Sequence, residues 1–141
     1  MTAKEYLSQY HLLNLRINSL IEERQRTREL AGAVSSPMSG GGGHSSDDRI
    51  GKIIAKLVDL ENEINSDIDR LISLRKDIET VIDSVPDETQ RQLLIARYIN
   101  GRTFEQIAVE MHYSWRHTIR IHGDALSAVQ NVIECHIGKV V

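Results

Sequence analysis

Apolar residues near the N-terminus recur every three or four positions, which is the spacing that places them on one face of a helix. They are Tyr6, Tyr10, Leu13, Ile17, Leu20 and Ile21. Charged residues dominate the positions that follow, from Glu22 to Arg28. The pattern predicts an amphipathic helix over residues 3–31 whose last turns are mostly solvated.

A longer repeat begins after residue 48, where apolar residues recur every seven positions in two rows. The first row is Ile50, Leu57, Ile64, Leu71 and Ile78, and the second is Ile53, Leu60, Asp67, Leu74 and Val81. Two such rows form the seam of a coiled coil. A helix over residues 48–84 would be about 54 Å long and would need a partner along this seam. That partner is the first helix folded back as a hairpin, a second copy of the chain, or both.

Asp67 interrupts the apolar seam at a core-type position. A polar residue there costs stability, and it commonly fixes the register by pairing with a polar group across the seam. A solvated kink in the helix is the alternative interpretation.

The segment between the two predicted helices is rich in glycine and serine and contains Pro37. It can bury too little apolar surface to order itself, so residues 32–47 are predicted to be a flexible linker. Pro86 ends the second helix, because the residue before a proline avoids the helical region. We therefore expect an all-α protein with a helical coiled-coil arm over residues 1–85 and a second domain over residues 86–141.

The sequence of the second domain predicts a series of short helices with capping residues. Asp87 can cap a helix that runs from Glu88 to about Asn100, and Gly101 suits the left-handed conformation that ends a helix. Thr103 and Gln106 then form a capping box for the segment "TFEQIAVEM". In that segment Ile107 and Met111 are expected to face inward.

A second start signal follows a short break at His112 and Tyr113. Ser114 is a good N-cap for a last helix, whose inner face is predicted to carry Ile121, Ala125, Leu126, Val129, Val132 or Ile133, and Ile137 before a stop at Gly138. Two capped helices joined by a three-residue turn are typical of a helix-turn-helix. His112 occupies the turn, and it fits there only if the turn tolerates a positive φ.

The stretch "TFEQIAVEMHYSWRHTIRIHGDAL" resembles the helix-turn-helix of region four of bacterial sigma factors, with Thr118 standing where that pattern usually has a buried valine. The upstream "LLIARYINGRT" is similar to the helix and turn that precede this element. Together with "DLENEINSDIDRLISLRKDIETVIDSV", the arrangement resembles small phage and prophage proteins grouped with the ArpU- and RinA-like regulators of late genes. The resemblance implies a transcription regulator. Nothing resembles sigma region two, so the chain is not expected to replace a full sigma factor.

The first turns of the last helix hold the candidate DNA-binding residues. In helix-turn-helix proteins the N-terminal residues of the second helix face the base edges, and here these are Ser114, Trp115, Arg116, His117, Ile119 and Arg120. Either arginine could donate two hydrogen bonds to a guanine edge or to phosphates. Trp115 could contact DNA or lie across the preceding helix as part of the core.

Composition narrows the remaining possibilities. The net charge of −3 argues against indiscriminate coating of nucleic acid, but residues 111–123 contain two arginines, three histidines and no acidic residue. The single Cys135 cannot form an internal disulfide, and the chain shows neither a signal-peptide pattern nor a run of eighteen apolar residues. We expect a cytoplasmic protein of a bacterial host that does not contact the membrane.

Metal binding and catalysis are not expected. His112, His117 and His122 follow each other at a spacing of five, which places successive side chains about 140° apart around a helix. No nucleophile stands beside a base, and "GGGG" lacks the lysine that follows it in a phosphate-binding loop. We therefore expect no enzyme activity, no cofactor and no metal site.

The leading hypothesis is a sequence-specific DNA-binding regulator of late phage genes that binds upstream DNA. Its expected partners are double-stranded DNA, bacterial RNA polymerase as a recruited enzyme, and a second copy of the chain through the heptad seam. The alternative is a protein-interaction or DNA-packaging module, similar to a small terminase subunit, in which the helix-turn-helix and the coiled coil serve for docking.

Overall fold

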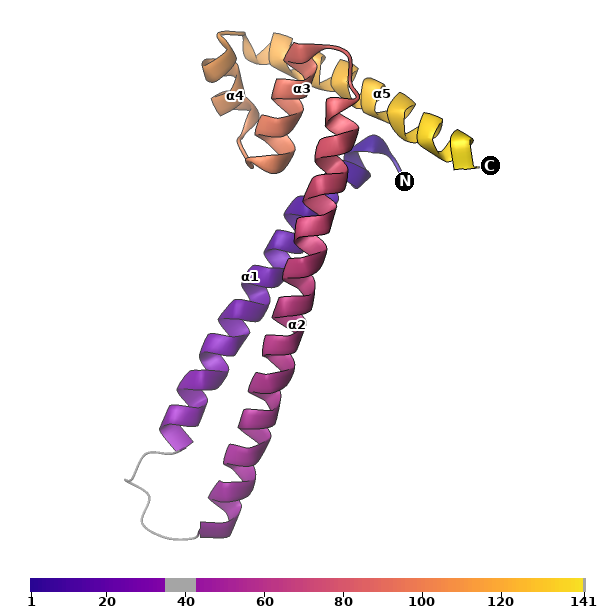
Figure 1. The fold of residues 1–141 in the computed structure, drawn as a ribbon. Coiled ribbons are helices and arrows are strands. Elements are labelled where there is room, and N and C mark those ends of the chain that lie inside the picture. The colour runs from indigo at the N-terminus through magenta and orange to yellow at the C-terminus, as the bar shows by residue number, and fades with distance from the viewer. Residues whose placement is uncertain (35–42, 141) are drawn as a thin grey trace. The chain divides into compact units, whose positions relative to one another are not determined.

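The computed structural model describes residues 1–34 and 43–140; in this part of the chain the regular elements are all helices, and there are no strands. The elements are α1 (Ala3–Val34), α2 (Gly43–Asp83), α3 (Glu88–Leu94), a π-helical turn η1 (Ile95–Ile99), α4 (Phe104–Met111) and α5 (Trp115–Val140) (Figure 1). The all-α prediction is confirmed, with a long helical hairpin followed by shorter helices.

The long helices extend beyond the predicted boundaries. Helix α1 continues to Val34 and α2 begins at Gly43, so both ends of the segment expected to be a linker, residues 32–47, are helical. Residues 35–42 of that segment lie outside the described residues. Helix α5 passes through Gly138 and reaches Val140, so the predicted stop at Gly138 is wrong. A glycine inside a helix costs only about 1 kcal/mol relative to alanine, which the rest of the helix can offset.

The chain divides into two compact units. One unit consists of Leu13–Arg70, and the other of Met1–Leu12 together with Leu71–Val141. Helices α1 and α2 each contribute residues to both units.

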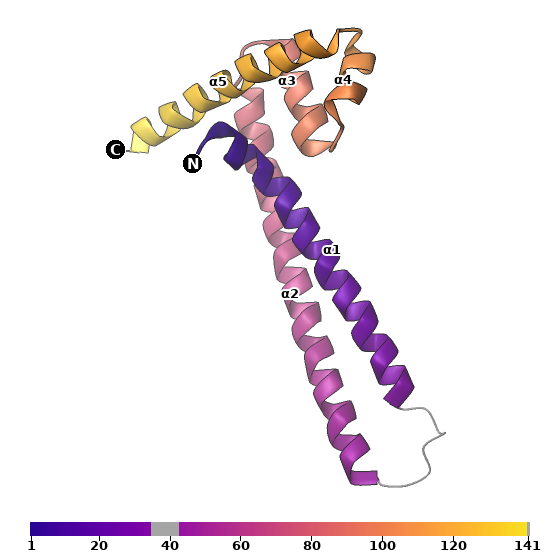
Figure 2. The same cartoon turned by 180° about the vertical axis from the view of Figure 1, so that it is seen from behind.

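The unit Leu13–Arg70 is a hairpin of two helices, which lie side by side in both views (Figures 1 and 2). Its buried apolar residues are Leu13 and Ile17 from α1 and Leu60 and Ile64 from α2. Ion pairs also cross between the helices: they join Arg24 to Glu61 at 2.7 Å, Arg28 to Glu61 at 3.1 Å and Lys56 to Glu23 at 3.2 Å. Within this unit, α1 is therefore the partner of the α2 seam. Association of two copies stays a prediction.

Asp67 lies in the seam, and its partners come from both helices. Its side chain is 5% exposed and accepts hydrogen bonds from Arg16 Nε at 2.8 Å and from Arg70 Nη1 at 3.1 Å. The Arg16 guanidinium, which also bonds Glu63 at 2.7 Å, lowers the pKa of the Asp67 carboxyl, and it outweighs the opposing effect of burial. Helix α2 runs through this point without a break. The polar pairing predicted for Asp67 is confirmed, and the kink is not found.

The other unit has an apolar core to which four helical segments and the π-helical turn contribute. Its buried members are Ala3 and Leu7 of α1, Ile78, Val81, Ile82 and Val85 from the end of α2, Leu94 of α3, Tyr98 of η1, and Ala125 and Val129 of α5. The seam residues Ile78 and Val81 thus share a core with the first turns of α1. This core holds the inner face of α5 in place.

Removing the guanidinium beside Asp67 is expected to destabilise the hairpin. Arg16→Ala would leave a carboxylate desolvated with only Arg70 beside it, so the Tm should fall by several degrees. Arg16→Ala/Asp67→Leu should recover most of that loss, because the apolar seam is then continuous. Arg26→Ala, an exposed arginine of α1, is the control. Thermal unfolding followed by circular dichroism makes the comparison, and equal Tm values for Arg16→Ala and Arg26→Ala would contradict it.

Candidate nucleic-acid interface

Local hydrogen bonds set the boundaries of the helix that precedes the candidate site. Asp87 Oδ1 accepts the backbone N–H of Gln90 at 2.9 Å, which confirms the predicted cap of α3. The helix expected to reach Asn100 widens into a π-helical turn, closed by a bond from the Asn100 N–H to the Ile95 carbonyl at 2.9 Å. Gly101 follows with φ of 69°, the left-handed conformation predicted for it.

Helix α4 begins with the predicted capping box. Thr103 Oγ1 accepts the Gln106 N–H at 3.2 Å, and the Gln106 side chain accepts the Thr103 N–H at 2.9 Å. Ile107 is buried as expected, and Met111, also expected to face inward, is half-buried; Ala108 is buried as well. Two orphan N–H groups are thereby satisfied, so the start of α4 is fixed by its own sequence.

The turn between α4 and α5 is closed by His112. This residue adopts φ of 60° and ψ of 39°, the left-handed conformation that its place in the turn requires. The next N–H, that of Tyr113, bonds back to the Ala108 carbonyl at 3.0 Å. Ser114 Oγ accepts the His117 N–H at 3.1 Å and caps α5, which confirms the second predicted start. The chain therefore passes from α4 to α5 within three residues.

One face of α5 packs inward. Thr118 is fully buried, and its hydroxyl donates to the Ser114 carbonyl at 2.9 Å, so the polar group that stands in place of the usual valine is satisfied within its own helix. Ala125 and Val129 are fully buried. The other predicted inner residues, Ile121, Leu126, Val132 and Ile133, are half-buried, and the side chain of Ile137 lies outside the described residues. Tyr113 is 38% exposed, and its ring lies edge-on against His117 with the ring centroids 4.6 Å apart.

The exposed positions at the start of α5 include most of the predicted DNA-binding residues. Arg116 and Arg120 lie opposite the buried face, and Trp115 lies at its edge. Ser114, Trp115, Arg116, His117 and Arg120 are exposed, and Ile119 is half-buried. Trp115 is 52% exposed, so it does not lie in the core. In the described part of the chain neither Arg116 nor Arg120 forms an ion pair, whereas the nearby Arg102 pairs with Glu110 at 2.9 Å. Two guanidinium groups thus remain available on the first turns of α5.

A cluster around His122 joins α5 to the preceding elements. His122 Nε2 lies 2.7 Å from the Tyr98 hydroxyl, and the rings of His122 and Phe104 meet edge to face at 4.8 Å. The Arg97 guanidinium covers the Phe104 ring at 4.2 Å from its centroid. Sequence analysis missed this cluster, because Tyr98 and His122 are 24 positions apart and no local pattern links them.

Burial is the main cause of a strong pKa shift at His122. Burial, together with the positive charges of Arg97 and Lys4, lowers the pKa of His122 from 6.5 to about 4. Burial likewise raises the pKa of Tyr98. The imidazole is therefore neutral, and its hydrogen bond with the Tyr98 hydroxyl links α5 to η1.

The three histidines between residues 112 and 122 make different contacts. His112 closes the turn, His117 lies on the Tyr113 ring and His122 belongs to the aromatic cluster. Among the described residues, no group of three or more histidine, cysteine, aspartate or glutamate side chains is arranged to hold a metal ion. Nor, in the same part of the chain, is any helix long and apolar enough to span a membrane.

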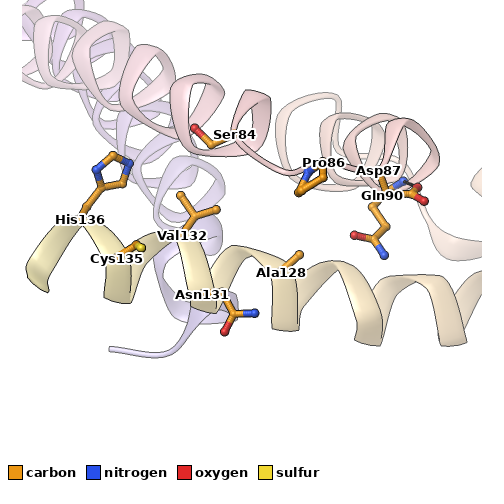
Figure 3. A pocket seen from close by; sticks show the side chains of 9 residues that line it. All are labelled: Ser84, Pro86, Asp87, Gln90, Ala128, Asn131, Val132, Cys135 and His136. Carbon is orange, nitrogen blue, oxygen red and sulfur yellow. Dashed lines mark hydrogen bonds between the residues drawn. The ribbon is translucent and has the colours of Figure 1, made fainter.

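A groove of about 660 Å³ lies elsewhere in the same unit (Figure 3). One wall is the junction of α2 and α3 at Pro86, and the other is α5 at Ala128 and Val132. Cys135 and His136 border it. The lining mixes apolar residues with polar ones such as Ser84, Gln90 and Asn131, and no residue of the predicted DNA-binding set takes part.

The fold and the site define an all-α protein in which a helical hairpin is joined to a capped helix-turn-helix element with an exposed second helix. The chain belongs to the family described as a protein of unknown function, DUF1492, whose model matches residues 31–130. The match includes α4 and all six predicted DNA-binding residues. No curated protein and no solved structure matches the chain.

The low pKa of His122 predicts a loss of stability in weak acid. The unfolded imidazole binds a proton below about pH 6.5 and the folded one only near pH 4, so the free energy of unfolding falls as the pH drops through this window. Glutamine does not titrate, so His122→Gln should remove this part of the pH dependence of the free energy of unfolding. It amounts to about 1–2 kcal/mol after allowance for the solvent that still reaches the ring. Urea unfolding at pH 4 and pH 7 measures it. The control is the exposed His117→Gln; a pH dependence in His122→Gln equal to that of the wild type would contradict the assignment.

Proposed function

We propose that this chain is a sequence-specific DNA-binding regulator of transcription that uses the first turns of α5 to read double-stranded DNA. The observation that carries the proposal is the exposed face of α5, where Arg116 and Arg120 form no ion pair with any described residue while the opposite face is buried. A surface with two free guanidinium groups and an exposed tryptophan suits base edges and phosphates.

The spacing of the outward residues supports DNA as the ligand. Arg116 and Arg120 are four positions apart, so both lie on one side of α5 about one turn apart. His117 lies on the same turn as Arg116, and Trp115 stands at the start of the helix. Phosphate is favoured at this helix end by the N-terminal dipole and its unpaired N–H groups. The arginine nearer the helix start can therefore contact the backbone while the other reaches a guanine.

The scaffold supports a rigid presentation of these residues. Both helices of the element are capped by side chains, and its turn is closed by two backbone hydrogen bonds. The Tyr98–His122 bond adds a polar contact two residues beyond Arg120 and on the inner side of α5. Side chains on a helix fixed in this way lose less conformational freedom when they bind.

The resemblance to ArpU- and RinA-like proteins extends the proposal to late genes of a phage or prophage. In that role the chain binds DNA upstream of a promoter and recruits RNA polymerase. A dimer would carry two α5 helices, which address two half-sites on the DNA.

Loss of the two free arginines is expected to weaken DNA binding without unfolding the protein. Arg116→Ala/Arg120→Ala should lower the affinity for the cognate site by about 10- to 100-fold and reduce the slope of log K against log[salt] by about two. Arg26→Ala/Arg49→Ala removes the same charge from exposed arginines in the other unit and should leave both quantities unchanged. Fluorescence anisotropy with labelled duplex at several salt concentrations provides the measurement.

The DNA sequence that the protein binds can be identified by selecting fragments from a genome. The purified full chain is incubated with sheared DNA of its own genome, and the retained fragments are sequenced. Enrichment of a short shared sequence upstream of genes supports the proposal. Uniform retention of fragments, or a ring-shaped assembly of many subunits in a mass measurement, would contradict it, and the ring would favour DNA packaging instead.

A further inference from the structure

Helix α2 has a second apolar face that is left exposed. Three of its residues belong to the hairpin unit, and the fourth, Ile72, follows two positions beyond that unit in the same unbroken helix. Ile54, Val58, Ile68 and Ile72 are 53%, 53%, 37% and 64% exposed, although each directly follows a seam position. At 100° per residue, these four side chains lie within an arc of about 80° on one side of the helix. They form a stripe about 27 Å long. We call this set the α2 stripe.

The α2 stripe is symmetric about position 63. Ile54 and Ile72 lie at equal distances before and after that position, and so do Val58 and Ile68. When two copies of α2 are placed antiparallel around this centre, Ile54 meets the partner subunit's Ile72 and Val58 meets the partner subunit's Ile68. A twofold interface requires this self-complementarity, because the same patch must serve on both copies.

The polar residues at the centre of the arc obey the same symmetry. Glu61 and Asn65 lie at equal distances on either side of position 63, on the same side of the helix as the α2 stripe. Glu61 Oε1 accepts hydrogen bonds from Arg24 and Arg28, while its Oε2 has no partner within the described ranges. In the antiparallel arrangement this oxygen faces the partner subunit's Asn65, whose amide can donate to it. The polar centre is therefore satisfied as well.

The apolar core of the hairpin unit is small, and further helices packed against it would enlarge it. Its buried apolar side chains, Leu13, Ile17, Leu60 and Ile64, come from only two helices. Helical domains normally bury such faces against additional helices, as four-helix bundles do. A second hairpin placed on the α2 stripe supplies two more helices and removes the exposed isoleucines and valine from water.

We propose that two copies of this chain associate as an antiparallel dimer through the α2 stripe. This interface differs from the heptad seam that the sequence suggested for dimerisation, because α1 occupies the seam in the hairpin unit. The dimer does not depend on DNA binding and is measured on the protein alone.

Sedimentation velocity of the full chain over about 1–100 µM tests the proposal, since an interface of this length is at the small end of stable interfaces. The wild type should move as a dimer at the upper concentrations. Val58→Glu buries two unpaired carboxylates in the dimer and should raise its dissociation constant about a hundredfold or more. Leu30→Glu, which places the same charge on an exposed residue of α1 outside the stripe, should leave the dimer intact. Circular dichroism checks that both variants are helical.

A charge pair tests the antiparallel register. In Val58→Glu/Ile68→Lys, each introduced carboxylate faces an introduced ammonium of the other copy, so the dimer should return relative to Val58→Glu alone. In a parallel register, like charges would meet and the dimer would stay lost. A wild type that is monomeric at 100 µM, a Val58→Glu dimer of wild-type strength, or a double variant without recovery would each overturn the proposal.

Discussion

The burial of one face of α5 is the constraint on which the site depends. Ala125 and Val129 are fully buried in a core shared with Leu7, Leu94 and Tyr98. Because a helix has one fixed angular order of side chains, fixing this face inward turns Arg116 and Arg120 outward. The Tyr98–His122 bond holds the same helix from its inner side. The available guanidinium groups are thus a consequence of packing elsewhere on the helix.

Features set by neighbouring residues could be predicted from the sequence. The caps at Asp87, Thr103 and Ser114 and the left-handed Gly101 depend on hydrogen bonds and backbone preferences within a few positions. The fold class followed from apolar periodicity in the same way. The helix ends at Val34, Gly43 and Val140 were missed, because glycine- and serine-rich segments have weak helix preference that their context can override.

Contacts between distant segments could not be read from local pattern. The sequence indicated that Asp67 needs a polar partner, but Arg16 stands 51 positions away and three other arginines of α1 were available. The His122 cluster depends on how α5 packs against the earlier elements. The residues of the candidate site could be predicted from their place at the start of α5. Their exposure, and the lack of ion pairs at Arg116 and Arg120 in the described chain, depend on the packing of distant segments.

Trp115 allows the most direct test of the proposed function, because it is the only tryptophan in the chain and stands on the candidate surface. Its fluorescence is titrated with the duplex selected from the genome, at low and at high salt. The account predicts a saturable change in emission that weakens as salt rises, since the indole becomes covered by DNA. Saturable DNA binding by an independent assay with no change in Trp115 emission would contradict the assignment of this surface.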